Sequence, residues 1–118
     1  MDFDSNKPIY LQISDSLCER ILCGEFPEDE RIPSVREYGS SIGVNPNTVM
    51  RTYEYLTQDG IIYNKRGIGY FVCPGAKAVI LEKQRKAFLE EELPEIVRRM
   101  KLLEIPLSVV AEYDKKEE

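Results

Sequence analysis

The sequence contains no histidine and only three cysteines, Cys18, Cys23 and Cys73. An odd number of cysteines without close pairs argues against a disulfide framework or a zinc knuckle, so we expect reduced thiols packed in helices and strands. Without histidine, the chain lacks the commonest general base and the commonest metal ligand. Its carboxylates stand singly or in solvated runs such as 90–92. We therefore expect no enzyme activity, no catalytic residue, no metal and no cofactor.

Long hydrophobic runs are also missing. No apolar stretch approaches the length of a membrane span, so we expect no membrane partner. The first residues show no basic segment followed by an apolar run, which predicts that there is no signal peptide. A length of 118 residues suits one compact domain, or a small domain with an appendage.

The net charge of −5 is unusual for a nucleic-acid-binding protein, but the charge is unevenly distributed. Residues 1–30 hold two basic and eight acidic side chains, a net of −6, and residues 67–118 hold nine and ten, a net of −1. Residues 31–66 hold five basic and three acidic side chains, a net of +2. If residues 31–66 bind DNA, the acidic surroundings should weaken non-specific binding and leave more of the affinity to specific contacts.

The first helix is predicted over residues 8–23. Pro8 suits a first helical position, and Gly24 suits a C-terminal cap. Apolar residues recur every four positions and form one stripe, namely Ile9, Ile13, Leu17 and Ile21. The next residues, 25–30, form a polar turn, and residues 31–33 are expected to add a short strand.

Two more helices are predicted around a tight turn. Ser34 and Glu37 form a Ser-x-x-Glu capping box, which opens a helix of about two turns that Gly43 ends. Asn45 is a favoured N-cap residue and is followed by proline, so a third helix is expected over 46–59. Two short helices joined by a turn at a glycine are typical of a helix-turn-helix.

The third helix is predicted to have two different faces. At 100° per residue, Val49, Tyr53 and Leu56 share an inner, apolar face. The opposite side is expected to carry hydrogen-bonding groups, from Asn47, Thr48, Arg51 and Tyr55.

Strands are predicted at 61–63 and 70–72, joined by a turn-rich loop over 64–69 that carries Lys65 and Arg66. This hairpin with a cationic tip is the wing of a winged helix-turn-helix. The predicted fold class is therefore mainly α with a small β-hairpin. Residues 73–75 break the pattern, so we predict a DNA-binding domain over 1–74 and a helical dimerisation tail over 75–118.

The tail is predicted to be helical from Ala76, with an apolar seam spaced 4, 3, 4 and 3 residues apart. Pro94 should kink or break this helix near Leu93. A second break at 105–106 precedes a short helix that reaches about Tyr113, and residues 115–118 are expected to fray. The seam consists of Leu89, Leu93, Ile96, Met100 and Leu103.

Several motifs occur together in one order and cover about residues 8–73. They are Pro8-Ile9-Tyr10, Gly24-Glu25, Arg31-Ile32-Pro33-Ser34-Val35-Arg36-Glu37, Gly43-Val44-Asn45-Pro46-Asn47-Thr48-Val49, Asp59-Gly60-Ile61 and Arg66-Gly67-Ile68-Gly69-Tyr70-Phe71-Val72. In this combination the chain resembles the GntR family of bacterial repressors, and its short tail resembles the YtrA-type subfamily. The resemblance implies a cytoplasmic, homodimeric regulator of a nearby operon, often one that encodes a transporter.

The chain departs from the family pattern in two places. Many relatives have Pro-Gly-Asp-Arg where this chain has residues 28–31, so the turn there lacks its glycine. Met50 stands where some relatives carry an arginine that touches DNA, so one contact is expected to be absent.

The expected DNA contacts of the third helix follow from its chemistry, because each base pair shows a distinct hydrogen-bonding pattern in the major groove. Arg51 can grip guanine with two hydrogen bonds or bind a phosphate. Asn47 can read adenine or hold a phosphate, and Thr48 can bind a phosphate or a thymine methyl group. Asn45 caps the helix more readily than it reads a base. A returning hydroxyl bond to the backbone is the alternative for Thr48.

Contacts from outside this helix are also expected. The family resemblance implies a DNA contact for Arg36, whose alternative is a surface salt bridge with a glutamate. Ser34 is primarily a cap and secondarily a phosphate donor. Lys65 and Arg66 suit the minor groove or flanking phosphates, rather than only solubilising a turn. Gly67 allows close approach to the DNA backbone.

A helix with one apolar seam needs a partner, and a second copy related by a two-fold axis is the usual solution. The alternative is a tail that folds back on its own winged domain. For the whole chain, a DNA-binding regulator competes with a winged module that binds only proteins. An enzyme is the third alternative, because some GntR relatives carry an aminotransferase domain after the winged domain. About forty-five residues follow the hairpin here, which is too few for such a domain. The sequence identifies no small-molecule effector.

Overall fold

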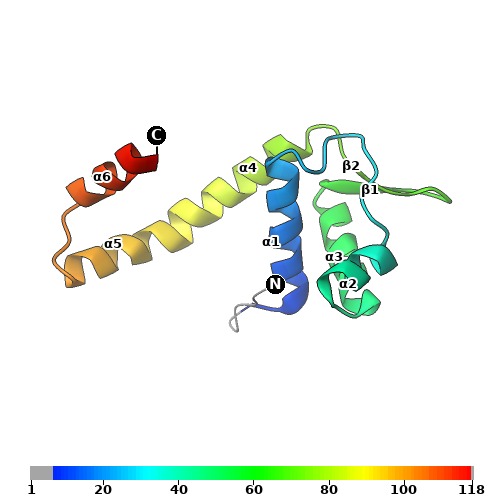
Figure 1. Ribbon diagram of the computed structural model, residues 1–118, viewed down its shortest axis with the longest axis horizontal. Helices are drawn as coiled ribbons and strands as arrows, with labels where there is room; N and C mark the ends of the chain where they lie inside the picture. Colours follow the sequence, from blue (N-terminus) through cyan, green and yellow to red (C-terminus); the bar gives the residue numbers. More distant parts are fainter. Residues whose placement is uncertain (1–6, 118) are drawn as a thin grey trace. The chain divides into compact units, whose positions relative to one another are not determined.

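A computed structural model describes residues 7–117 of the chain. It has the expected mainly helical architecture with one antiparallel hairpin (Figure 1). The chain divides into two compact units, the first ending at Glu82 and the second starting at Lys83. No helix in the described part of the chain is long and apolar enough to cross a membrane.

Helix α1 spans Ile9–Leu22, and local signals set both of its ends. Pro8 is the N-cap rather than the first helical residue, and its carbonyl oxygen accepts hydrogen bonds from the N–H groups of Leu11 and Gln12. At the other end, Gly24 has a φ of +89°, and the Glu25 N–H donates to the Arg20 carbonyl at 3.0 Å. This bond closes the helix in the manner expected of a C-terminal glycine.

Helices α2 (Val35–Ile42) and α3 (Pro46–Gln58) form the helix-turn-helix. The capping box is confirmed, since the Glu37 N–H donates to Ser34 Oγ at 3.1 Å and the Ser34 N–H donates to Glu37 Oε1 at 3.2 Å. Gly43 ends α2 in the left-handed conformation, as predicted. Gly39 allows the turn to approach α2 closely, because a Cβ there would lie 2.7 Å from the Val44 carbonyl oxygen.

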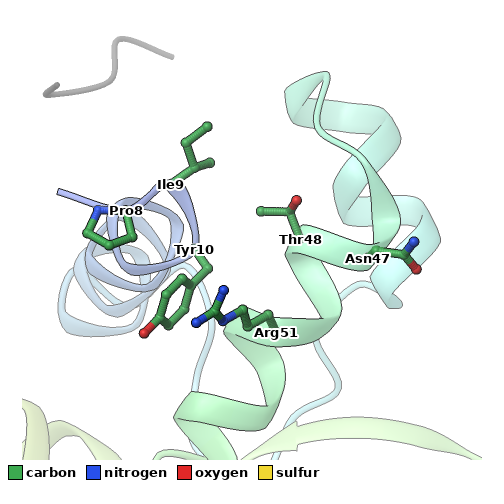
Figure 2. Close-up of a pocket in the computed structure, with 6 residues that line it drawn as sticks. All are labelled: Pro8, Ile9, Tyr10, Asn47, Thr48 and Arg51. Atoms are coloured by element: carbon green, nitrogen blue, oxygen red, sulfur yellow. The ribbon is translucent and has the colours of Figure 1, made fainter.

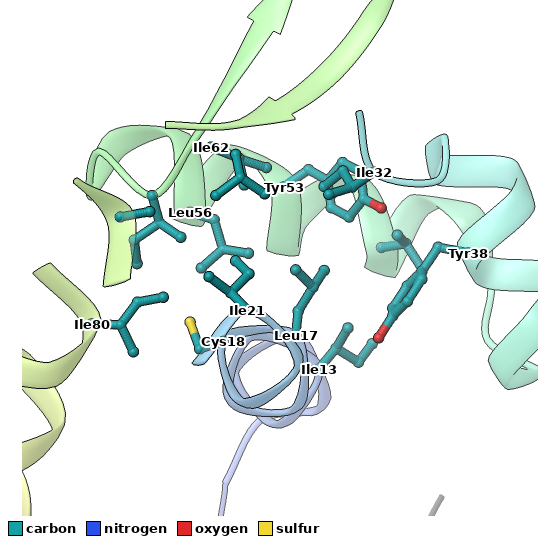
Figure 3. Close-up of a cluster of buried hydrophobic side chains, with 14 residues drawn as sticks. Ile13, Leu17, Cys18, Ile21, Ile32, Tyr38, Tyr53, Leu56, Ile62 and Ile80 are labelled. Carbon is teal, nitrogen blue, oxygen red and sulfur yellow. The ribbon is translucent and has the colours of Figure 1, made fainter. Parts of the chain in front are cut away.

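One apolar core joins these helices to the hairpin (Figure 3). The predicted inner face of α3 is confirmed, since Val49, Tyr53 and Leu56 are fully buried. Ala76 and Ile80 from the start of α4 (Ala76–Ala87) are also buried in this core. The first compact unit therefore continues beyond residues 73–75, where the sequence pattern breaks, because Ala76 and Ile80 complete its packing.

The hairpin pairs strand β1 (Ile62–Lys65) with β2 (Gly69–Val72), in a register that sets Lys65 opposite Gly69. The strands are longer than predicted, and only residues 66–68 form the turn, because pairing continues to the last residue before it. The expected strand at 31–33 is a single bridge between Arg31 and Phe71.

The second unit contains the end of α4, a π-helical turn η1 (Phe88–Glu92), and helices α5 (Leu93–Leu102) and α6 (Ser108–Glu117). We expected Pro94 either to kink the helix or to break it near Leu93. The helix is not broken there, because η1 continues directly into α5. A wider turn precedes it instead, in which the Leu93 N–H donates to the Phe88 carbonyl. A proline lacks the N–H for a regular helical bond and its ring crowds the preceding turn, so a π turn relieves both problems.

The break near 105–106 is confirmed, but α6 extends to Glu117. The expectation of fraying was wrong for Lys115–Glu117, and Glu118 lies outside the described residues. None of the three cysteines forms a disulfide, and Cys18 is buried in α1 as expected. The expectation of packing was wrong for Cys23, which is exposed at the C-cap of α1, while Cys73 is half-buried just after β2.

Candidate nucleic-acid interface

The amino end of α3 is held by its own core side and presents its other side to solvent. Asn45 caps the helix as predicted, with its side-chain oxygen accepting from the Asn47 N–H at 2.8 Å. Asn45, Asn47 and Arg51 are exposed, and Thr48 is half-buried. The buried inner face therefore fixes the helix while leaving amide and guanidinium groups free to reach a partner.

An open hollow of about 360 Å³ lies between the starts of α1 and α3. It is lined by Pro8, Ile9, Tyr10, Asn47, Thr48 and Arg51 (Figure 2). The Arg51 guanidinium carbon lies 4.1 Å from the centre of the Tyr10 ring. Asn47 points away from Tyr10 and Arg51, so the Asn47 amide and the Arg51 guanidinium lie on different sides of α3 (Figure 2).

Tyr55 does not belong to the outward polar face on which we predicted it. Its ring is half-buried, packs against the core and meets the Tyr10 ring edge-on, with centroids 6.1 Å apart. The helical period alone placed it outward, but α1 covers this flank of α3.

The start of α2 presents Ser34 and Arg36. The Ser34 hydroxyl accepts the capping bond from Glu37, so its main role as a cap is the one expected. Arg36 is exposed, and the described residues offer it no ion pair. The alternative of a surface salt bridge for Arg36 is therefore not realised within the described chain.

The wing extends past the helices of the first unit (Figure 1). Lys65 closes strand β1, and its ammonium nitrogen lies 5.1 Å from the centre of the Phe71 ring. Arg66 and Gly67 occupy the turn itself and are exposed, with Gly67 at a φ of +80°. Gly67 thus provides the tight turn that places two cations at the hairpin tip.

Arg31 is a cation at this surface that the sequence reasoning missed. Its side chain packs on the wing so closely that a Cβ on Gly69 would lie 2.9 Å from Arg31 Nε. The bridge to Phe71 fixes its backbone there. The available signals were its place in the locally positive segment and a second glycine in the hairpin, but only the fold shows that the two meet.

Five cations therefore lie on the helix-turn-helix and the wing, namely Arg31, Arg36, Arg51, Lys65 and Arg66. Within residues 7–117, none of them forms an ion pair. Arg20 behaves differently, because its guanidinium donates two hydrogen bonds to Glu25, at 2.8 and 2.7 Å, which raise the pKa of Arg20. The unpaired cations can instead neutralise phosphates, which is the main electrostatic source of DNA affinity.

A helix-turn-helix with an exposed second-helix start, followed by a cationic hairpin, defines a winged helix-turn-helix DNA-binding protein. The family model of the bacterial regulatory proteins of the gntR family matches residues 9–72. The chain belongs to the GntR family of transcriptional regulators.

Known relatives cover most of the chain. It is 40% identical to the HTH-type transcriptional regulator YhcF of Bacillus subtilis, over 86% of this chain and 82% of that protein. It is 35% identical to the transcriptional repressor YtrA of the same organism, over 82% of this chain and 74% of that protein. This similarity agrees with the resemblance to the YtrA type.

Solved structures share the fold. A GntR-family regulator from Bacteroides thetaiotaomicron superposes with a TM-score of 0.75 and 44% identity, covering 94% of this chain and all of that one. The DNA-binding domain of AraR, solved in complex with an operator, gives a TM-score of 0.56 and 26% identity over 62% of this chain and 88% of that one.

Proposed function

We propose that the chain binds a two-fold operator as a homodimer and represses transcription from it. The observation that carries this proposal is the exposed amino end of α3, held by a fully buried inner face. Such an end fits the major groove, where side chains can reach the base edges. The operator complex of the related AraR domain supports the same use of this fold.

The residues divide into two roles in this proposal. Arg51 and Asn47 read bases, guanine and adenine respectively, because their side chains can make paired hydrogen bonds to those bases. Thr48 and the capped start of α2 position the protein on phosphates. Arg36, Lys65 and Arg66 add charge, while Gly67 lets the backbone come close at the wing.

Dimerisation is assigned to the second unit. Leu89, Ile96 and Leu103 of the predicted seam are 58%, 44% and 59% exposed. Leu93 and Met100 are half-buried. A row of large apolar side chains left open in this way favours association with a second copy. Two winged domains can then contact two half-sites, which one small domain cannot do.

Repression is proposed because the relative YtrA, with which the chain shares most of its length, is a repressor. A dimer that occupies an operator can exclude other proteins from the same DNA. Cytoplasmic location follows from this role, because the operator lies in the cell's interior.

DNA binding is tested by fluorescence anisotropy with duplexes enriched from a random pool, over a series of salt concentrations. Arg51→Ala should lose roughly 1–3 kcal/mol of discrimination between the enriched duplex and its base-substituted forms. Arg66→Ala should weaken binding to all sequences and flatten the salt dependence. Arg85→Ala, which removes an exposed cation of α4, is the matched control. Equal discrimination by Arg51→Ala and the parent would remove Arg51 from base reading.

Dimerisation is tested by sedimentation equilibrium at micromolar concentration. Ile96→Glu and Leu103→Glu place a charge in the seam and should yield monomers that bind a single half-site weakly. Lys101→Glu changes charge on the same helix α5 outside the seam and serves as the control. A monomeric parent chain at these concentrations would refute the dimer.

A further inference from the structure

We propose that Tyr10 is a positioning residue for Arg51, so that the start of α1 sets the sequence specificity of α3. The inference rests on the proposed function, since it concerns how the base-reading side chain is held before DNA arrives. The inference is based on a contact between the two side chains: the guanidinium carbon of Arg51 lies 4.1 Å from the centre of the Tyr10 ring (Figure 2).

Tyr10 is itself fixed in two ways. Its carbonyl oxygen accepts a hydrogen bond from Thr52 Oγ1 at 2.7 Å, and Thr52 is fully buried in α3. Its ring meets Tyr55 at an interplanar angle of 79°. The first contact holds the Tyr10 backbone against α3, and the second packs its ring against a side chain of the same helix, so the ring lies as a platform beside Arg51.

Arg51 has another potential partner within reach. Glu54 lies three residues further along α3, at a spacing where helical side chains commonly pair, and both line a second hollow beside Tyr10. Within the described chain, the two nevertheless form no ion pair. The side chain is held by a ring instead of a carboxylate.

This choice of partner matters for recognition. A carboxylate would occupy the N–H groups that a guanine requires, whereas contact with an aromatic ring consumes no N–H donor. Arginine also loses rotamer freedom when it binds a base, and a side chain that is already confined loses less. The ring therefore lowers the cost of base reading without competing for it.

Loss of the Tyr10 ring should change how well the protein discriminates between DNA sequences, and should leave the salt dependence of binding unchanged. Tyr10→Leu should reduce the preference for the base pair that Arg51→Ala identifies by roughly three- to tenfold, at an unchanged salt slope. Tyr10→Phe keeps the ring and should match the parent. The double variant Tyr10→Leu/Arg51→Ala should discriminate no worse than Arg51→Ala alone.

The experiment measures anisotropy with the enriched duplex and a complete set of single base-pair substitutions, and thermal melting checks that each variant folds. Should Tyr10→Leu keep the discrimination that Arg51→Ala loses, Tyr10 has no positioning role. Equal losses in Tyr10→Phe and Tyr10→Leu would assign the effect to the hydroxyl and also overturn the inference. If the parent binds no duplex, or Arg51→Ala has no effect, the proposed function itself fails.

A second measurement needs no variant of Tyr10. In the free parent protein, the ring should shift the side-chain proton resonances of Arg51 upfield. Resonances at ordinary positions would show that the arginine is not held over the ring in solution, and would contradict the proposal.

Discussion

The backbone N–H of Asp29 donates to the carbonyl oxygen of Val72 at 2.8 Å, although Asp29 itself lies in the left-handed region with a φ of +64°. Asp29 stands where the family resemblance implies the glycine of a Pro-Gly-Asp-Arg turn. The turn to the wing is thus formed without that glycine. Aspartate is one of the few residues with a side chain that tolerates this conformation.

Asp29→Gly should leave the fold intact and raise the free energy of unfolding by up to about 1 kcal/mol, because relief of backbone strain outweighs the added freedom of the unfolded chain. Asp29→Val should lower it by about 1–2 kcal/mol, since a branched side chain opposes a positive φ. Urea unfolding measures both. Glu30→Gly is the control, where no positive φ exists and glycine should not stabilise. An Asp29→Val variant as stable as the parent would contradict the turn geometry.

Tyr53 connects α3 to the start of the helix-turn-helix. Its hydroxyl donates to the Pro33 carbonyl oxygen at 2.6 Å, and burial raises the pKa of Tyr53, which keeps the donor proton in place. Tyr53→Phe leaves that carbonyl without this donor and should cost about 1–2 kcal/mol of stability. Tyr63→Phe, which removes a hydroxyl from the half-buried ring on β1, should change stability by less than about 0.5 kcal/mol. Similar losses in the two variants would contradict this account.

Because Arg31 packs against the wing, we expect its guanidinium to contact a DNA phosphate there. Arg31→Ala should weaken binding to all duplexes alike and lower the salt slope by about 1. Gly69→Ala should weaken binding too, because its new Cβ would displace Arg31 Nε and because the φ of +139° at Gly69 is strained for alanine. In the Arg31→Ala background, the same glycine change should cost less affinity. Independent, additive losses measured by anisotropy would show that the two residues do not act together.

The capping box predicts a pH dependence of stability. The Ser34 backbone N–H, and then its hydroxyl, lower the pKa of the Glu37 carboxyl below its ordinary value of 4.5. A carboxyl with a lowered folded-state pKa stabilises fully above its unfolded-state pKa, and this contribution is lost as the pH falls through the folded value. The urea concentration at the midpoint of unfolding should therefore decrease as the pH is lowered below about 4.5. Glu37→Gln should make that fall shallower, and an unchanged profile would exclude Glu37 as a cause.

Local signals predicted most of the first unit. Ser34 with Glu37, and Asn45 before a proline, marked the two helix starts, because a cap depends on neighbouring residues only. The helical period likewise identified the buried face through Val49 and Tyr53. These features need no knowledge of distant contacts.

The sequence could not predict contacts between distant segments. Arg31 meets Gly69, and Arg51 meets Tyr10, only because the folded chain brings separate elements together. Tyr55 was misplaced for the same reason, since α1 covers its side of the helix. At Pro94, the residue type predicted a disturbance, but a kink, a break and a π turn are all possible responses to a missing N–H.

Selection of bound sequences from a pool of random duplexes, followed by sequencing, tests the central claim most directly. The account predicts an enriched pattern with two-fold symmetry, whose half-sites lie about one helical turn, roughly 10–10.5 base pairs, apart or at a multiple of that distance. The pattern should lose a defined base preference when Arg51→Ala is selected in parallel. A pool that stays random, or a single unpaired half-site as the full preference of the parent chain, would contradict it.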